Sequence, residues 1–132
     1  MNKVVVRFAD GRIVKGTTAD FVPTKDLFHL NLVTDTVGTK PVEINKSELK
    51  ALFFVRDFKG NPEYIESKVF AEEKRPAGRM VEVTFKDDEV LVGTTLGYDP
   101  KRSGFFLFPA DPESNNLRVF AVSKAVKKIQ LK

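Results

Sequence analysis

Short runs of alternating apolar and polar residues make up most of the chain. From Val4 to Phe8, valine or phenylalanine occupies every second position, which is the period of a β-strand. Asp10-Gly11 follows, a dipeptide that favours the tight turn of a β-hairpin because glycine adopts positive φ angles without steric cost. The sequence therefore predicts a hairpin whose second strand runs over residues 12–21.

Gly16 lies near the middle of this second strand. Glycine inside a strand often marks a bulge or a sharp bend, and such a bend lets a small sheet curl. Turn-forming residues then divide the following residues into short apolar segments. The elements expected there are a loop at 23–26, strands at 27–32 and 41–44, turns at 35–39 and 45–48, and a strongly apolar strand at 49–55.

The same pattern occurs a second time further along the chain. Residues 4–30 align without a gap on residues 81–107, so that Gly16 coincides with Gly93. Self-similarity at a fixed offset indicates a repeated structural unit, and we expect two homologous units of roughly 53 residues, here called copy one and copy two. The strands expected in copy two are 80–86, 89–98, 105–108, 117–122 and 127–131.

Residues 56–78 separate the two copies and resemble neither. The segment is charged and is punctuated by glycine and proline, as connections often are. It also contains apolar residues that a free linker would not need, namely Phe58, Tyr64, Ile65, Val69 and Phe70. We expect three parts: a first small β-barrel over 1–55, a connecting segment over 56–78 that packs on the barrels, and a second small β-barrel over 79–132.

Five short strands, a bend in the second and a one-turn link before the fifth resemble the plan of SH3-like small barrels. Among these the copies are most similar to the Sm-like fold, through the stretch VVVRFADGRIVKG and the short turn before LKALFFV. The resemblance covers both copies but not 56–78, and it implies an all-β protein of two tandem five-stranded SH3/Sm-like barrels. The RNA-contacting motifs of Sm proteins are not matched at residues 26–31 or at Lys46-Ser47. The stretches FFVRDF and GFFLFP are also similar to those of uncharacterised bacterial domains.

Size and composition give expectations about the stability, assembly and localisation of the protein. The chain has 132 residues and no cysteine, so disulfides cannot stabilise it. A unit of about 50 residues is marginal alone, so we expect the copies to share an interface, or the chain to form a homo-oligomer through exposed edge strands. No apolar run approaches a membrane span and no signal peptide is recognisable, which predicts a soluble cytoplasmic protein without a membrane partner.

Residues suited to catalysis are scarce. His29 is the only histidine, and no nearby carboxylate or nucleophile is spaced to make it a general base. Asp87, Asp88 and Glu89 form the only acidic cluster, but consecutive residues at a hairpin tip point in different directions and make a poor set of metal ligands. We therefore expect no enzyme activity, no metal and no cofactor.

The most promising polar site is the loop at residues 99–104 of copy two. It combines basic residues with flanking aromatic residues, as small barrels do when they hold single-stranded nucleic acid. Such binding would place Lys101, Arg102, Arg118 and Lys124 on one face. The candidate binding residues are Tyr98, Lys101, Arg102, Asn115, Asn116 and Arg118.

Arg75 and Arg79 form a second candidate site. Their spacing just before a strand resembles the opening of the PilZ domain, which binds cyclic di-GMP, and paired guanidinium groups suit phosphate. The second PilZ motif is not matched, because residues 99–104 have a different spacing.

These features predict a non-enzymatic binding or assembly module whose partner is an unidentified protein or a second copy of the chain. Two alternatives stay open. One is the binding of single-stranded RNA or another nucleic acid in the Sm-like manner, and the other is nucleotide sensing through Arg75 and Arg79.

Overall fold

A computed structural model describes residues 1–33, 40–59 and 77–132. The turn expected at 35–39 and most of the connecting segment expected to pack on the barrels lie outside these residues. The described part contains ten strands, two single-turn 3₁₀ helices and no α-helix. The strands are β1 (Asn2–Phe8), β2 (Ile13–Thr18), β3 (Leu27–Leu32), β4 (Val42–Asn45), β5 (Leu49–Val55), β6 (Arg79–Phe85), β7 (Val90–Thr95), β8 (Gly104–Pro109), β9 (Asn116–Val122) and β10 (Val126–Leu131); the 3₁₀ helices are η1 (Lys46–Glu48) and η3 (Ser123–Ala125).

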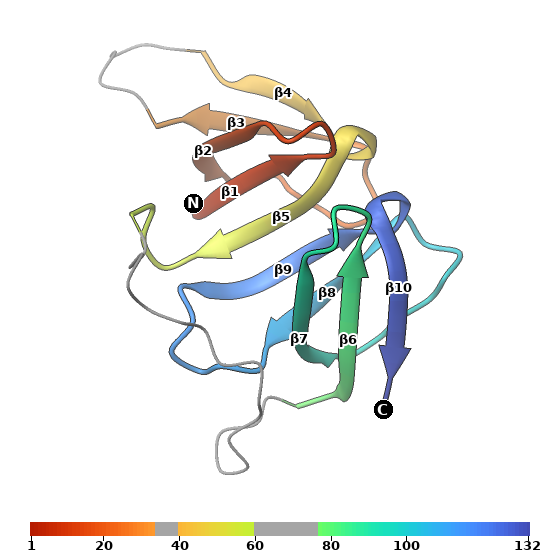
Figure 1. The fold of residues 1–132 in the computed structure, drawn as a ribbon. Helices are drawn as coiled ribbons and strands as arrows, with labels where there is room; N and C mark the ends of the chain where they lie inside the picture. The colour runs from red at the N-terminus through yellow and green to blue at the C-terminus, as the bar shows by residue number, and fades with distance from the viewer. Residues whose placement is uncertain (34–39, 60–76) are drawn as a thin grey trace.

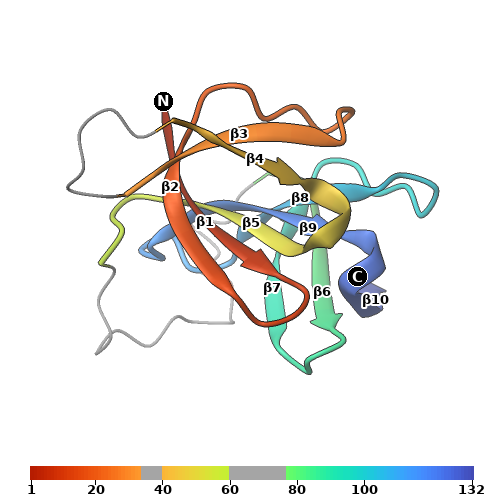
Figure 2. The same ribbon diagram turned by 90° about the horizontal axis from the view of Figure 1, so that it is seen from above.

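All ten strands form one antiparallel sheet in the order β10-β6-β7-β8-β9-β5-β1-β2-β3-β4. The first five positions of this order repeat the last five, with each strand replaced by its counterpart in the other copy. Strands β9 and β5 run side by side in the middle and join the copies, and β4 and β10 lie at the two edges (Figures 1 and 2). The all-β prediction is confirmed. The sheet does not close on itself, so two separate closed barrels are not what the structure shows.

The internal repeat extends to strand register and turn geometry. Asn2 pairs with Thr18 in copy one, and the equivalent residues Arg79 and Thr95 pair in copy two. The first hairpin turn has Gly11 at φ 98°, and its repeat-equivalent Asp88 adopts φ 72°. Aspartate tolerates the left-handed region better than most residues do, so the turn keeps its shape although the glycine is absent. The predicted hairpins and repeat are confirmed.

Gly16 and Gly93 permit a close approach of backbones rather than a free bend. A Cβ atom added at Gly16 would overlap the carbonyl oxygen of Asn31, and one added at Gly93 would overlap that of Phe108. Asn31 and Phe108 are themselves repeat-equivalent. Each glycine therefore lets the third strand of its copy cross closely over the second, which explains why both copies carry glycine there.

The central strand β5 is buried on both faces. Ala51, Phe53 and Val55 point into the core of copy two, whereas Leu52 and Phe54 point into the core of copy one. Strand β9 behaves in the same way, because alternate side chains of a strand project to opposite faces. Its residues divide as follows: Val119 and Ala121 join the copy-two core, and Phe120 and Val122 join the copy-one core.

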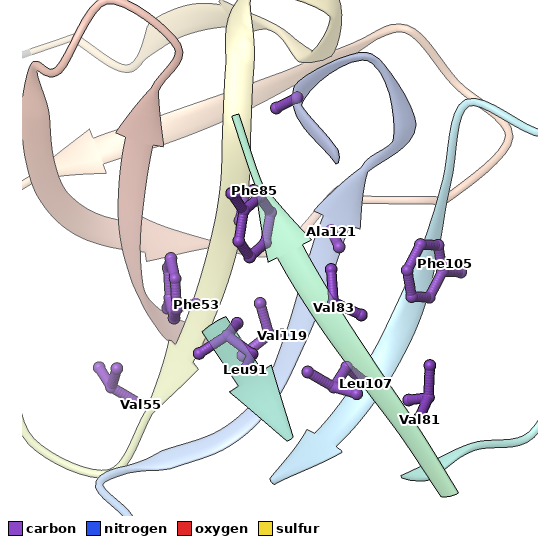
Figure 3. Packing of buried hydrophobic residues seen from close by; sticks show 12 residues of the cluster. Phe53, Val55, Val81, Val83, Phe85, Leu91, Phe105, Leu107, Val119 and Ala121 are labelled. Carbon is purple, nitrogen blue, oxygen red and sulfur yellow. The ribbon is translucent and has the colours of Figure 1, made fainter. Parts of the chain in front are cut away.

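Each core thus contains side chains from both copies. Figure 3 shows Phe53 and Val55 from β5 packed in the same cluster as Val83 and Phe85 from β6. The expectation that two marginal units share an interface is borne out by this arrangement. Because neither core is complete without the other copy, we expect the chain to unfold as one unit.

Candidate functional site

A groove of about 640 Å³ opens at the junction of the two copies. Aromatic residues of β8 and β9 form its floor, and loops from both copies form its walls. We call it the aromatic groove. Its lining consists of Pro23, Thr24, Thr95, Leu96, Gly97, Arg102, Ser103, Gly104, Phe105, Phe106, Phe108 and Phe120. This lining contains a cation and no carboxylate, so it favours ligands with apolar surface and negative charge.

The floor of the groove belongs to a cluster of phenylalanine rings. Phe106 and Phe120 meet edge to face with their ring centroids 5.2 Å apart. Phe21, from copy one, contacts Phe106 at 6.3 Å, Phe120 at 5.0 Å and Phe54 at 5.9 Å. Such edge contacts fix ring orientation, so the floor is a preformed surface.

The guanidinium of Arg118 lies beside this floor. Its Cζ is 4.3 Å from the ring centroid of Phe54 and 4.7 Å from that of Phe106. No carboxylate of the described residues forms an ion pair with it. An arginine held on aromatic faces keeps its N–H donors in a fixed plane, and they are therefore available to an anionic ligand.

Arg102 stands at the rim of the groove. Its side chain is 77% exposed, and its Nε lies 4.0 Å from Asp99 Oδ2, at the limit of an ion pair. The loop that carries it is ordered by backbone contacts: Lys101 N donates to Asp99 Oδ1 at 2.9 Å, and Ser123 Oγ donates to the Arg102 carbonyl at 3.0 Å. The side chain of Arg102 can thus reach a ligand from a fixed loop.

Lys46 supplies a buried cation beneath the groove. Only 2% of the residue is exposed, and its Nζ donates to the carbonyl of Pro23 and lies 5.4 Å from the ring centroid of Phe120. Burial lowers the pKa of Lys46, and the charge of Asp26 opposes this effect. Lys46 therefore fastens a wall of the groove, Pro23, to its floor.

The other predicted binding residues lie elsewhere. Tyr98 packs edge to face on Phe105, with centroids 5.0 Å apart, and belongs to the copy-two core. Asn115 holds the chain after β5, because its side chain donates to the Asp57 carbonyl at 2.8 Å and accepts from Asp57 N at 3.1 Å. Asn116 pairs with Val55 at the β5–β9 junction.

The set predicted from the sequence is therefore split. The aromatic groove holds Arg102 in its lining, with Arg118 beside it, while Asn115 and Asn116 line a separate groove of about 430 Å³. Lys124 lines a third cavity, of about 300 Å³. Lys101 is exposed on the loop next to Arg102.

His29 does have a carboxylate partner, contrary to the expectation from the sequence. Its Nδ1 lies 2.7 Å from Asp20 Oδ2, and its backbone N–H donates to Asp20 Oδ1 at 2.9 Å. These bonds from His29, the backbone one first, lower the pKa of Asp20. The loop at 23–26 was expected, but the pairing was missed because the path of this loop, which brings Asp20 to β3, does not follow from its turn residues. Both side chains are about half exposed, as a surface pair would be.

The acidic cluster at the second hairpin tip binds lysines. Lys50 Nζ lies 2.7 Å from Asp87 Oδ2 and also contacts Glu89 Oε1, and Lys127 Nζ lies 3.1 Å from Asp88 Oδ1. The hydrogen bond from Lys50 lowers the pKa of Asp87. The tip of copy two is thus clamped to β5 of copy one. No cluster of three or more potential metal ligands occurs among the described residues.

The structure places only one member of the second candidate pair. Arg79 is exposed at the start of β6, and its Nε donates to the carbonyl of Lys132 at 3.4 Å. Arg75 lies outside the described residues. Phosphate binding by this pair therefore stays a prediction.

Comparison with known protein families covers the whole chain. The model of a family of unknown function, DUF6982, matches residues 1–132. The chain belongs to DUF6982. Comparison with curated proteins gave no match, and comparison with solved structures gave none either. In the described part of this DUF6982 protein, no helix has the length and apolar character needed to cross a bilayer.

Proposed function

We propose that this DUF6982 protein is a non-enzymatic binding module built from two SH3/Sm-like small barrels in tandem. The proposal for the fold is supported by the strand order, since each copy arranges its five strands in the order five, one, two, three, four. A 3₁₀ turn precedes the fifth strand in both copies.

The binding function rests on one observation: an aromatic floor with one guanidinium group in its lining, a second beside it, and no carboxylate in the lining. Arg118 lies on the rings of Phe54 and Phe106, and Arg102 stands at the rim. Ligand sites are concave and mostly apolar, with few polar groups that fix orientation, and the aromatic groove has this character. Leu96, on its wall, is 72% exposed, which adds apolar surface for a partner.

Single-stranded nucleic acid is a second candidate for the ligand of this groove. Bases stack on aromatic faces, and arginine contributes both cation–π contact and phosphate binding. The contact of Arg118 with Phe106 favours this candidate, because a base that stacks on the partly exposed ring of Phe106 would place its phosphate near Arg118. The small cationic surplus of the chain, +4 overall, favours a ligand with few phosphates.

A titration with labelled single-stranded RNA, at low and at physiological salt, separates the two candidates. Nucleic-acid binding predicts an affinity that falls with salt by about 0.7 logarithmic units per phosphate contact for each unit of log salt. It also predicts a loss on Arg118→Met, which keeps the apolar packing but removes the charge, and partial retention on Arg118→Lys. Absence of salt-sensitive binding would leave a protein or small anionic aromatic ligand as the occupant.

The remaining alternatives gain no support from the described residues. Nucleotide sensing through Arg75 and Arg79 stays a prediction, since only Arg79 is placed. Self-association through edge strands also stays a prediction. The edge strands β4 and β10 carry exposed charged residues, among them Glu43 on β4 and Lys128 on β10, which limit pairing to strands with complementary residues.

A further inference from the structure

Strand β10 is the repeat-equivalent of β5, and the outer edge of β10 corresponds to the edge of β5 that pairs with β9. Strand β5 pairs with β1 on one side and with β9 on the other. Its counterpart β10 pairs with β6 and, among the described residues, has no neighbour on its other side. Figure 1 shows β10 at the end of the sheet, beside the C-terminus. Unpaired backbone groups at such an edge can bond an added strand.

In copy one, the equivalent edge is the side of β5 that pairs with β9, here called the acceptor edge, and it receives an aromatic side chain. Phe120 of β9 lies opposite Leu52 of β5. Its ring meets Phe21 edge to face at 5.0 Å, and Lys46 Nζ lies 5.4 Å from its centroid. Phe120 is 1% exposed and Leu52 is fully buried, so the added strand seals the core of copy one.

Copy two has the equivalent groove without the aromatic side chain. A groove of about 400 Å³ lies beside β10. The repeat carries Phe21 onto Tyr98 and Leu52 onto Ile129, and both equivalents line this groove. Its full lining is Tyr98, Pro100, Ser123, Val126, Lys127, Lys128, Ile129 and Leu131. Tyr98, Val126, Ile129 and Leu131 are only partly buried, because no described residue takes the place that Phe120 has in copy one.

We propose that the β10 groove accepts an extended segment of another protein, which adds to the sheet as an antiparallel strand. The segment places an aromatic residue opposite Ile129, against Tyr98, as β9 places Phe120 opposite Leu52. Main-chain hydrogen bonds supply affinity in this mode of recognition, and pockets for alternate side chains supply specificity. This site is distinct from the aromatic groove, so the inference goes beyond the function proposed above.

Charge defines the other face of the added strand. In β5 the residues that face copy two are apolar, but their equivalents in β10 include Lys128 in place of Ala51 and Gln130 in place of Phe53. Lys128 forms no ion pair with a described residue, and the lining of the groove contains no carboxylate. The register of β5 with β9, in which Ala51 lies opposite Ala121, puts an acidic residue of the partner opposite Lys128 and directly after its aromatic residue.

A second copy of this chain does not fit as the partner. Its edge strands are β4 and β10. Strand β10 carries two lysines and no aromatic residue. In β4, Glu43 stands at the position of Phe120 and Asn45 at the position of Val122. Glu43 would therefore enter the apolar pocket formed by Tyr98 and Ile129. In addition, Lys128 would face the apolar side of β4 that carries Ile44. The partner is thus a lone acidic and aromatic strand rather than a further folded copy.

The test uses the full chain and a synthetic peptide that copies the natural occupant of the acceptor edge. The peptide has the sequence of Asn116–Val122 with the changes Arg118→Thr and Ala121→Glu. Addition of the peptide to ¹⁵N-labelled protein is expected to shift the amide signals of β10 and Ser123 and to slow hydrogen exchange along the outer edge of β10. The matched control peptide carries Phe120→Ser and is expected to bind at least about tenfold more weakly, because it loses a buried aromatic side chain.

A charge exchange tests the register. Lys128→Glu is expected to weaken binding of the peptide about threefold to tenfold, since a favourable cross-strand pair becomes a repulsive one. A peptide with lysine at the Ala121 position is expected to restore it. Lys3→Glu, at another exposed strand lysine, serves as the control and leaves binding unchanged. Lys128 is exposed, so the variant keeps the fold, which circular dichroism verifies.

Three results would overturn the proposal. The first is the absence of shifts on β10 at about 1 mM peptide, which sets binding weaker than about −4 kcal/mol. The second is equal binding of the control peptide, or shifts confined to Phe106 and the aromatic groove. The third is a concentration-dependent dimer that Lys128→Glu abolishes, which would make a second copy the partner. Of these results, only shifts confined to the aromatic groove bear on the function proposed above, and they would support it.

Discussion

Replacement of Phe120 by alanine tests whether the two copies form one cooperative unit. Phe120 belongs to the sequence of copy two, yet it is buried in the core of copy one. It packs against Phe21 and Phe106 with centroid distances of 5.0 and 5.2 Å. A substitution in the sequence of copy two therefore opens a cavity in the core of copy one.

The cost follows from burial and packing. Replacement of a fully buried phenylalanine by alanine lowers the free energy of unfolding by about 3–5 kcal/mol. The value for Phe120 is expected in the upper part of that range, because two edge contacts contribute about 0.5–1.5 kcal/mol each beyond buried area. Domains of this size have about 5–15 kcal/mol of stability in total. The variant thus loses a large share of the free energy of unfolding.

Urea denaturation and native-state hydrogen exchange measure this effect. We expect one transition, displaced to lower urea, and reduced protection of amides in β1 and β3 as well as in β9. Leu117→Ala on the same strand is the control, because Leu117 is 47% exposed and its replacement costs less than about 0.5 kcal/mol. A loss below about 1 kcal/mol for Phe120→Ala, or a loss of protection limited to copy two, would refute the shared-core account.

Three further variants probe charge and backbone packing. Lys50 holds the pKa of Asp87 below its ordinary value, so the pair stabilises the fold at neutral pH, and this stability is lost as the pH falls through the pKa of folded Asp87. In Lys50→Met, the urea midpoint should therefore fall less as the pH is lowered. Burial lowers the pKa of Lys46, so at alkaline pH the unfolded chain binds more protons than the folded chain does, and the free energy of unfolding rises as the pH approaches 10.5. In Lys46→Met, the urea midpoint should rise less over this range. Gly93→Ala forces a Cβ against a backbone carbonyl and should cost about 1–3 kcal/mol in thermal or urea unfolding, whereas Gly97→Ala, with open space around it, should cost far less.

Local and repeated features of the fold were predictable from the sequence. The hairpin at Asp10-Gly11, the repeat and the strand Leu49–Val55 follow from residue periods and turn chemistry, which act over a few residues. A special role for Gly16 was predicted from its place inside a strand. The close approach of the Asn31 carbonyl, which requires the glycine, was not predicted, because it depends on how the second and third strands cross. Strand ends differ by a few residues where a loop residue turns inward, as Tyr98 does to pack on Phe105.

The junction of the copies and the composition of the site were not predictable in the same way. The apolar sequence LKALFFV indicates a strand buried on both faces, but it does not say which strand lies beside it. Pairing of β5 with β9 brings Phe54 to Arg118, although they are far apart in the chain. The stacking of Arg118 and the Asp20–His29 pair both depend on such non-local contacts.

Site-specific photocrosslinking most directly tests the central claim that the aromatic groove is a ligand site. A photoreactive phenylalanine analogue replaces Leu96, an exposed residue on the groove wall, and in a second variant it replaces Leu117, an exposed apolar residue outside the lining. If the groove binds a ligand, position 96 gives a defined crosslinked species in cells. This species is absent from position 117 and is lost when Phe106→Ser is added. Equal crosslinking from both positions, or none from position 96, would contradict the claim.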